Sequence, residues 1–408
     1  MRPFHCIFLF VLCVSQFMPL AFCVMAMPTI LISQGVPLEQ ISLIYLTGII
    51  WVLKFLWAPL IDRVKFGAFG HYKVWLLISQ LLLVAACILF TIVGDDQNFQ
   101  MMMILALVLS VFASTQDIAS DAIACRIIPE KKRGLGSAIQ LSGGLLATML
   151  GGGVVLIVYE HIGWQACMWV ISASVAASAL FIIWFDEREI ALKDGHEIKQ
   201  PTFGRLFSFW LQPGMAIWAA ALIVLPLSIT VVWALASPVL IDRGWTTDKI
   251  GIVLHIVAPV LGIVTSVIFG SLLNRYNKWL VISVVPILQL ASLLLFFTFL
   301  QLPLASTGVV IAALSVYAID IGLFVILNAF KLEYSDTGTE GTDFTVQNSM
   351  HGIAAFSIAG GALYFAESAG FANLTLIACG IAVTSGLFLY GVLLLKRKEG
   401  PLAALLPS

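Results

Sequence analysis

Charged residues are scarce in this 408-residue sequence: Asp, Glu, Lys and Arg make up 11% of it, against about a quarter in an ordinary globular protein. A soluble chain of this length would have to present many more polar groups to water, so the scarcity excludes a soluble protein. The formal net charge of −1 provides no basic field, and no nucleic-acid partner is expected. With 61% hydrophobic residues, the composition predicts a polytopic membrane protein.

Motifs for enzyme chemistry and for bound metal are lacking as well. The seven cysteines include no CxxC pair and the histidines have no metal-ligand spacing, so we expect neither a disulfide framework nor a metal site. The sequence contains no Walker-type glycine loop and no nucleophile elbow. We therefore expect no cofactor and no enzymatic activity. A membrane enzyme or a non-transporting membrane sensor are the alternatives from other functional classes.

Long apolar stretches dominate what is present, and twelve of them approach or exceed the ~20 residues of a spanning helix. The first is longer than the ~7–15 residues of a signal-peptide core, although Arg2 and Ala26 give it some features of a signal peptide. We expect an uncleaved helix there. The predicted spans are 4–30, 41–61, 73–93, 100–127, 135–159, 163–185, 214–240, 250–273, 279–299, 303–331, 343–366 and 372–395.

The polar segment from Asp186 to Gln212 divides these spans into two sets of six. We predict an N-terminal six-helix bundle over 1–185, a cytoplasmic linker over 186–213 and a C-terminal six-helix bundle over 214–408. Thr29–Ile44 aligns without gaps with Pro238–Val253, 209 residues later, and Gly134 and Gln140 match Gly341 and Gln347, 207 residues later. Matches in one order at nearly one spacing indicate a parallel duplication, and hence two pseudo-symmetric bundles.

The distribution of lysine and arginine predicts the orientation. If both termini are cytoplasmic, most basic residues fall on cytoplasmic segments, and only Arg243 and Lys249 fall outside. This asymmetry follows the positive-inside rule. We predict a multi-pass protein of the bacterial inner membrane with both termini in the cytoplasm.

Four charged residues lie at bilayer depth, away from the ends of the predicted spans: Lys54, Asp117, Asp121 and Asp320. Each costs about 2.5–3.5 kcal/mol at bilayer depth on insertion scales, so each needs a partner or a function. Asp117 and Asp121 share one helical face, and Lys54 lies at a similar depth, where it could neutralise the pair. One interpretation is a site that couples protons or binds a substrate carboxylate. The other is a structural ion pair that fixes the second span against the fourth.

Asp320 lies about 16 Å from Lys331 along its helix, near the bilayer midplane. Transporter substrate sites lie at this depth, between the two halves. No complementary cation is visible in the second half at the same depth. Asp320 is therefore a second candidate proton carrier, with a neutral acid hydrogen-bonded inside the bundle as the alternative.

Three segments carry a resemblance to a known family: KFLWAPLIDR (54–63), QDIASDA (116–122) and RGLGSAIQLSGG (133–144), followed by Gly163 and Trp164. They resemble the AmpG-like branch of the major facilitator superfamily, which includes muropeptide permeases, RhtX/FptX-type siderophore importers and acetyl-CoA transporters. The resemblance implies the major facilitator fold, with 12 transmembrane helices. It also implies functional roles for the lysine of the second span and for the Gln-Asp…Asp pattern, here Lys54, Gln116, Asp117 and Asp121.

The loop after the second span is similar to the signature that major facilitator proteins carry there. Asp62 and Arg63 fit it, but His71, Tyr72 and Lys73 replace its usual run of arginines. Asn274 and Arg275 match Asp62 and Arg63 in the second half. Such charges latch the cytoplasmic side of a bistable transporter, so we expect a gating role for Asp62, Arg63 and Arg275. The alternative is that they only set topology.

These inferences together predict a secondary active importer, a monomer that moves a medium-sized organic solute inward and is driven by protons. The chain ends soon after Lys396, whereas muropeptide permeases commonly carry further helices. This length favours an iron-siderophore complex as the substrate. A muropeptide is the alternative substrate within the same superfamily.

Overall fold

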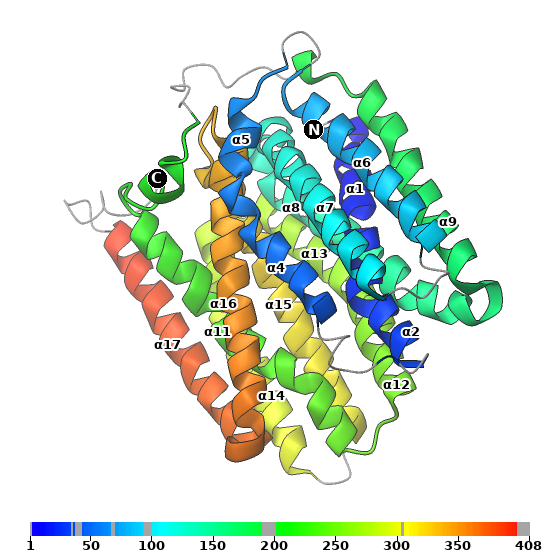
Figure 1. Cartoon of the computed structure of the whole chain (residues 1–408). Coiled ribbons are helices and arrows are strands. Elements are labelled where there is room, and N and C mark those ends of the chain that lie inside the picture. Colours follow the sequence, from blue (N-terminus) through cyan, green and yellow to red (C-terminus); the bar gives the residue numbers. More distant parts are fainter. Residues whose placement is uncertain are drawn as a thin grey trace. The chain divides into compact units, whose positions relative to one another are not determined.

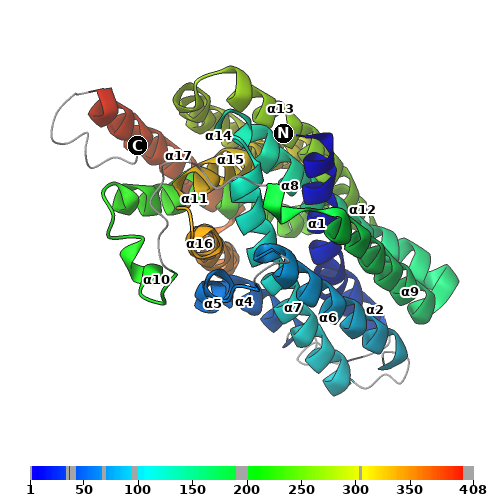
Figure 2. The same ribbon diagram turned by 90° about the horizontal axis from the view of Figure 1, so that it is seen from above.

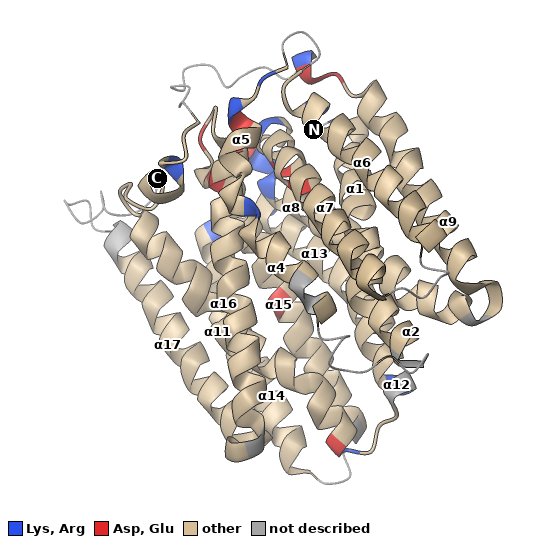
Figure 3. Cartoon of the chain, viewed as in Figure 1, with Lys and Arg blue, Asp and Glu red and all other residues tan. Residues whose placement is uncertain are grey.

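The structure is a computed structural model that describes residues 2–33, 36, 43–66, 70–93, 99–189, 201–302 and 306–397. These residues are almost entirely helical and include no strand (Figure 1). Eleven helical stretches among them are long and apolar enough to cross a membrane. In Figure 3 the long helices carry few charged residues along their length. The predicted all-α polytopic fold is confirmed.

The first predicted half contains eight helices in the described residues, besides single turns. They are α1 (Pro3–Ala21), α2 (Met27–Ser33), α4 (Leu46–Leu53), α5 (Ala58–Arg63), α6 (Tyr72–Val93), α7 (Phe99–Ile127), α8 (Arg133–Thr148) and α9 (Val155–Trp184). π-helical turns connect α1 to α2 and α8 to α9. Within α9 the backbone leaves helical geometry at Gly163, whose φ of 73° favours glycine. This kink coincides with the predicted start of the sixth span.

The second half and its linker add eight helices. They are α10 (Arg205–Ser208), α11 (Met215–Asp242), α12 (Thr247–Ile252), α13 (Ala258–Arg275), α14 (Lys278–Gln301), α15 (Ser306–Tyr334), α16 (Glu340–Ala369) and α17 (Phe371–Arg397). A π-helical turn connects α12 to α13. The two helices form one predicted span, the eighth.

The second predicted span, 41–61, is not one continuous helix. α4 ends at Leu53, a 3₁₀ turn follows over Lys54–Leu56, and α5 begins at Ala58. Pro59, in the first turn of α5, has no N–H for a bond to the preceding turn, so an unbroken α-helix is disfavoured here. This interrupted span completes the twelve expected from the sequence, and the interruption lies at Lys54.

Contacts group the residues into two compact units. The first unit contains Met1–Glu130, Ile139–Leu206 and Ser335–Ser349, and the second contains Lys131–Ala138, Phe207–Tyr334 and Met350–Ser408. Each unit thus includes a short segment that the sequence assigns to the other half. For the first unit that segment is the start of α16, and for the second it is the start of α8.

Each unit has its own apolar core. Phe22, Phe90 and Trp164 meet in the first, and Leu235, Leu293 and Phe296 lie in the second. Helices in a bilayer associate by close packing, because lipid is as apolar as their side chains. Gly143 of α8 illustrates this packing: a Cβ there would lie 2.7 Å from the carbonyl oxygen of Phe10 in α1. Glycine is required for this approach.

Candidate functional site

Lys54 and Asp117 form an ion pair inside the first unit. Nζ of Lys54, in the 3₁₀ turn between α4 and α5, contacts Oδ2 of Asp117 on α7. The whole residues are 2% and 4% exposed, so both charges are removed from solvent. The ring of Trp51 lies 4.9 Å from Nζ and adds a cation–π contact. Because the turn interrupts the helix, the backbone geometry is irregular at the residue that carries the charge.

Two amide side chains complete this cluster. Nε2 of Gln16 on α1 donates to Oδ1 of Asp117, so both carboxylate oxygens have a donor. Asp121, one turn further along α7, accepts from Nε2 of Gln140 on α8 at 3.0 Å. Lys54 therefore pairs with Asp117, and Asp121 has an amide donor instead. We call Lys54, Asp117, Asp121, Gln16 and Gln140 the Lys54 cluster.

Gln116, predicted to act with this cluster, faces a different set of side chains. Its Nε2 donates to Oε1 of Gln80 on α6 at 2.8 Å. Nε2 of Gln80 in turn donates to the hydroxyls of Ser15 at 3.1 Å and Ser178 at 2.8 Å. All four side chains are buried, and they connect α1, α6, α7 and α9. Since Gln116 precedes Asp117 in α7, this network helps to fix the rotation of α7 that directs Asp117 toward Lys54.

Asp320 lies on α15 in the second unit, with its side chain partly buried. Among the described residues it forms no ion pair and no hydrogen bond. Tyr317, one turn earlier on α15, is close enough to interact electrostatically with it. Asp320 therefore differs from the two aspartates of the Lys54 cluster, each of which has a donor.

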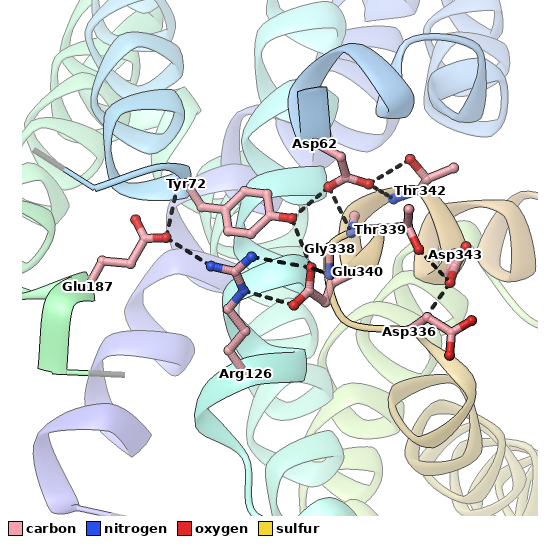
Figure 4. A network of polar contacts seen from close by, with 11 residues as sticks. Asp62, Tyr72, Arg126, Glu187, Asp336, Gly338, Thr339, Glu340, Thr342 and Asp343 are labelled. Carbon is pink, nitrogen blue, oxygen red and sulfur yellow. Dashed lines mark hydrogen bonds and ion pairs between the residues drawn. The ribbon is translucent and has the colours of Figure 1, made fainter. Parts of the chain in front are cut away.

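Asp62 caps the start of α16, and both of its oxygens are used. Oδ2 accepts from the backbone N–H and the hydroxyl of Thr342 at 2.7 and 2.6 Å, and Oδ1 accepts from the N–H of Gly341 at 3.1 Å (Figure 4). The first N–H groups of a helix have no partner within the helix, and its dipole attracts a negative charge there. Asp62 supplies the acceptors and the charge.

Gly341 is required for this approach. A Cβ on Gly341 would lie 2.6 Å from Oδ1 of Asp62 and 3.1 Å from Cγ2 of Ile118. Any larger residue would push the carboxylate away from the helix end. Gly341 matches Gly134 in the sequence duplication, and close packing requires glycine at Gly341.

An arginine and two glutamates extend the contact. Arg126, near the end of α7, donates from Nε to Oε1 of Glu340 at 2.9 Å and from Nη1 to Oε1 of Glu187 at 3.4 Å. The hydroxyl of Tyr72 donates to Oδ1 of Asp62 at 2.7 Å. The Arg126 guanidinium lies 4.5 Å from the centre of the Tyr72 ring. We call Asp62, Tyr72, Arg126, Glu187, Glu340 and Thr342 the α16 network (Figure 4).

Arg205 of α10 binds the same end of α16. Its Nε and Nη2 each lie 2.7 Å from an oxygen of Asp343, a bidentate pair, and Nη2 also lies 2.5 Å from Oδ2 of Asp336. Asp343 accepts from the hydroxyl of Thr339 at 3.0 Å as well. A charged, buried bidentate contact of this kind is strong and directional. The linker segment is therefore bound to α16 inside the first unit.

His71 lies beside the α16 network, with its ring 4.3 Å from that of Tyr72. Burial, together with the positive charges of Arg126 and Lys65, lowers the pKa of His71 from 6.5 to about 4. The fold thus favours the neutral imidazole. The stability that the neutral imidazole contributes to the folded state is fully present above pH 6.5 and is lost as the pH falls toward 4.

We expect this loss in a thermal unfolding series of the purified protein. Between pH 6.5 and 4 the melting temperature of the wild type should fall more steeply than that of His71→Asn, which cannot titrate there. Parallel curves for the two proteins would contradict a depressed pKa at His71.

The second unit contains an ion pair at the duplicated positions, with the charges exchanged. Nη1 of Arg133, the first residue of α8, lies 3.5 Å from Oε2 of Glu333 near the end of α15. Glu333 is 207 residues after Arg126, and Glu340 is 207 residues after Arg133. Lys278 of α14 also pairs with Glu333. Each unit therefore has an Arg–Glu pair between the end of one long helix and the start of another. In the first unit the arginine is at the helix end and the glutamate at the helix start, and in the second unit the two are exchanged.

The three predicted gating residues have different environments. Asp62 is buried in the α16 network, whereas Arg63 and Arg275 are exposed.

Sequence reasoning missed Tyr72, Arg126, Glu187, Glu340 and Arg205. A signal for two of the ion-pair positions was available, because the 207-residue offset that matches Gly134 with Gly341 also relates Arg126 to Glu333 and Arg133 to Glu340. No group of three His, Cys, Asp or Glu in the described part of the chain could hold a metal ion.

A polytopic helical protein with duplicated units and ionisable groups inside its spans has the characteristics of a secondary membrane transporter. The family pattern described as Major Facilitator Superfamily matches residues 7–360, and the chain belongs to that superfamily. The chain is also similar to curated proteins of the AmpG-like branch.

Two curated relatives illustrate this similarity. The anhydromuropeptide permease of Escherichia coli (strain K12) is 26% identical over 261 residues, which are 64% of this chain and 53% of the permease. The match thus spans about half the length of that relative. A Rickettsia conorii protein that carries the name AmpG 4 is 23% identical over 281 residues, 66% of this chain and 68% of the relative.

Solved structures show the fold. The E. coli fucose:proton symporter superposes with a TM-score of 0.69 at 13% identity, covering 96% of this chain and 99% of the symporter. The human organic anion transporter MFSD10 gives a TM-score of 0.68 at 15% identity, with 95% and 100% covered. The chain is a multi-pass membrane protein of this superfamily.

Proposed function

We propose that this transporter imports a muropeptide, a cell-wall fragment, into the bacterial cytoplasm and is driven by protons. The name of the E. coli relative supports this substrate. The iron-siderophore complex favoured by chain length has no such support among the relatives described above, so the alternative substrate is the better supported one. We propose the bacterial inner membrane as the location, with both termini in the cytoplasm and a monomer as the transporting unit.

The Lys54–Asp117 pair is the observation that carries the mechanism. A buried carboxylate in contact with an ammonium group can release its partner when it takes up a proton, because protonation removes the charge that holds the pair together. The interrupted helix at Lys54 provides a backbone able to respond locally. Protonation of Asp117 would free Lys54, and deprotonation would restore the pair.

The other predicted residues have separate roles in this proposal. Asp121, held by Gln140, lies one turn from Asp117 and is the second acid of the first unit that can bind a proton or a substrate group. Asp320 is a proton carrier in the second unit. Gln116 positions α7 through Gln80.

Gating is assigned to the ends of the spans. Asp62 and the α16 network join the fifth helix of the second half to the helices of the first half, and would have to separate when the cytoplasmic side opens. Arg63 and Arg275, at the ends of the second and eighth spans, belong to the same proposed gate. Their exposed guanidinium groups remain available for contacts in another state.

Uptake into proteoliposomes tests the substrate and the coupling together. With an acidic exterior, the protein should accumulate a radiolabelled anhydromuropeptide, and a protonophore should abolish the accumulation. Ferric siderophore in excess should not compete. Uptake of the ferric siderophore, with no uptake of the muropeptide, would overturn the substrate assignment. Accumulation that continues in the presence of the protonophore would overturn the proposed proton coupling.

A further inference from the structure

An exposed apolar stripe precedes α11, outside the helices that span the membrane. Phe203, Phe207 and Leu211 are 54%, 76% and 83% exposed. They are four residues apart, and their exposure alternates with that of Arg205 and Phe209, which are buried. We call these three residues the 203/207/211 stripe. Leu211 is the most exposed of the large apolar residues in the described part of the chain.

The segment that carries the stripe has helical turns and a buried opposite side. The N–H of Trp210 donates to the carbonyl of Phe207 at 3.1 Å, and that of Leu211 donates to the carbonyl of Ser208 at 3.3 Å. Arg205 and Phe209, also four apart, are 7% and 1% exposed. The segment is thus amphipathic, and its polar group is turned inward toward Asp336 and Asp343.

The segment leads directly into a membrane-spanning helix (Figure 2). Gly214 has a φ of 83°, a conformation that suits glycine, and α11 begins at the next residue, Met215. Leu211 is only four residues from that start, a reach of ~14 Å even for a fully extended chain. The headgroup region on each side of a bilayer is about 5–7 Å thick. Leu211, the end of the stripe nearest the span, therefore lies within reach of this region.

We propose that the 203/207/211 stripe rests in the membrane, at the boundary between lipid headgroups and acyl chains on the side where α11 begins. In the proposed orientation this is the cytoplasmic leaflet. The contact is apolar rather than electrostatic, because Arg205 is the only charged residue from Pro201 to Gly214 and it is bound to two aspartates. This assignment does not depend on the identity of the substrate.

A protein partner fits the stripe less well. A stable interface buries about 800 Å² on each partner, whereas two aromatic rings offer about 150–250 Å² each and one leucine adds less. The start of α11, four residues after Leu211, brings the segment to the bilayer without a second molecule. Arg205 lies on the opposite side of the segment. With the stripe in the membrane, its guanidinium therefore stays directed toward the start of α16.

Spin labels test this placement in nanodiscs of zwitterionic phosphatidylcholine. Phe207→Cys and Leu211→Cys would each carry a nitroxide, with Ser208→Cys as the matched control on a neighbouring exposed position. Six of the seven native cysteines are buried and one is partly buried, so labelled wild type provides the background to subtract. The readout is the ratio of collision with oxygen, which enriches in lipid, to collision with a water-soluble nickel chelate.

We expect this ratio to be at least about three-fold higher at 207 and 211 than at 208. We also expect it to stay unchanged when anionic lipid is added. Equal, water-like ratios at all three positions would overturn the proposal. Labels at 207 and 211 shielded from both reagents would mean that protein covers the stripe and would also overturn it. A ratio that rises only with anionic lipid would overturn the apolar contact.

Discussion

Asp117→Asn should abolish proton-driven accumulation and also destabilise the protein. The amide cannot carry the charge that balances Lys54, which is 2% exposed. Removing one partner of a buried ion pair typically costs about 3–5 kcal/mol, because the remaining charge stays buried without compensation. Uptake should fall by about 100-fold or more, a loss to which unfolding and lost coupling both contribute.

The double variant Lys54→Met with Asp117→Leu separates these two causes. Replacing a buried ion pair by apolar residues of similar volume is often neutral or stabilising, so the double variant should recover the thermal stability that Asp117→Asn loses. It should still fail to accumulate substrate against a gradient, because the ion pair proposed to open on protonation is gone, although Asp121 remains one turn away. Substrate exchange without a proton gradient should continue.

Thermal unfolding, proton-driven uptake and exchange, measured on the same preparations, decide the outcome. Ser114→Ala is a matched control: it lies on α7, is buried, and its hydroxyl bonds the carbonyl of Val111 in its own helix. This control should transport like wild type. Wild-type accumulation by the double variant would show that the pair is structural, the alternative that the sequence leaves open.

Depth along a helix is the part of this site that sequence could predict. Each residue of an α-helix rises 1.5 Å, so Lys54 and Asp117 could be placed at similar depths from the ends of their spans. The structure brings them into contact. Depth does not give rotation, however, and the direction of Gln116 depends on Gln80, which belongs to another helix. Gln116, which was predicted to act with Lys54, therefore contacts Gln80 in a neighbouring network instead.

Hydropathy predicted the spans because a bilayer imposes one length and one composition on every helix that crosses it. It could not predict the break at Lys54, since the apolar stretch continues through it, although Pro59 gave a local indication. The α16 network was also beyond local patterns. Asp62 and Thr342 are separated by 280 residues, and only the fold brings the carboxylate to the helix end.

Reversing the Arg126–Glu340 pair should restore what each single reversal destroys. Glu340→Arg alone would place two guanidinium groups together near the start of α16, and Arg126→Glu alone would add an acid beside Glu340 and Glu187. Each single variant should lose about 10-fold or more of its transport rate, because like charges replace a hydrogen-bonded ion pair. Arg126→Glu combined with Glu340→Arg should recover a large part of the loss.

The duplicated pair in the second unit makes this expectation specific. Arg133 and Glu333 occupy the equivalent positions with the opposite order of charge, so the fold already accepts either direction of the pair at this structural position. Uptake rates of the single and double variants measure the coupling between residues 126 and 340 as a double-mutant cycle. Lys132→Glu, an exposed change beside Arg133, controls for altered surface charge and should leave the rate within about two-fold. A double variant as inactive as the single ones would mean that Arg126 is required for its contacts with Tyr72 and Glu187, and that the exchange of charges between the units has no functional equivalence.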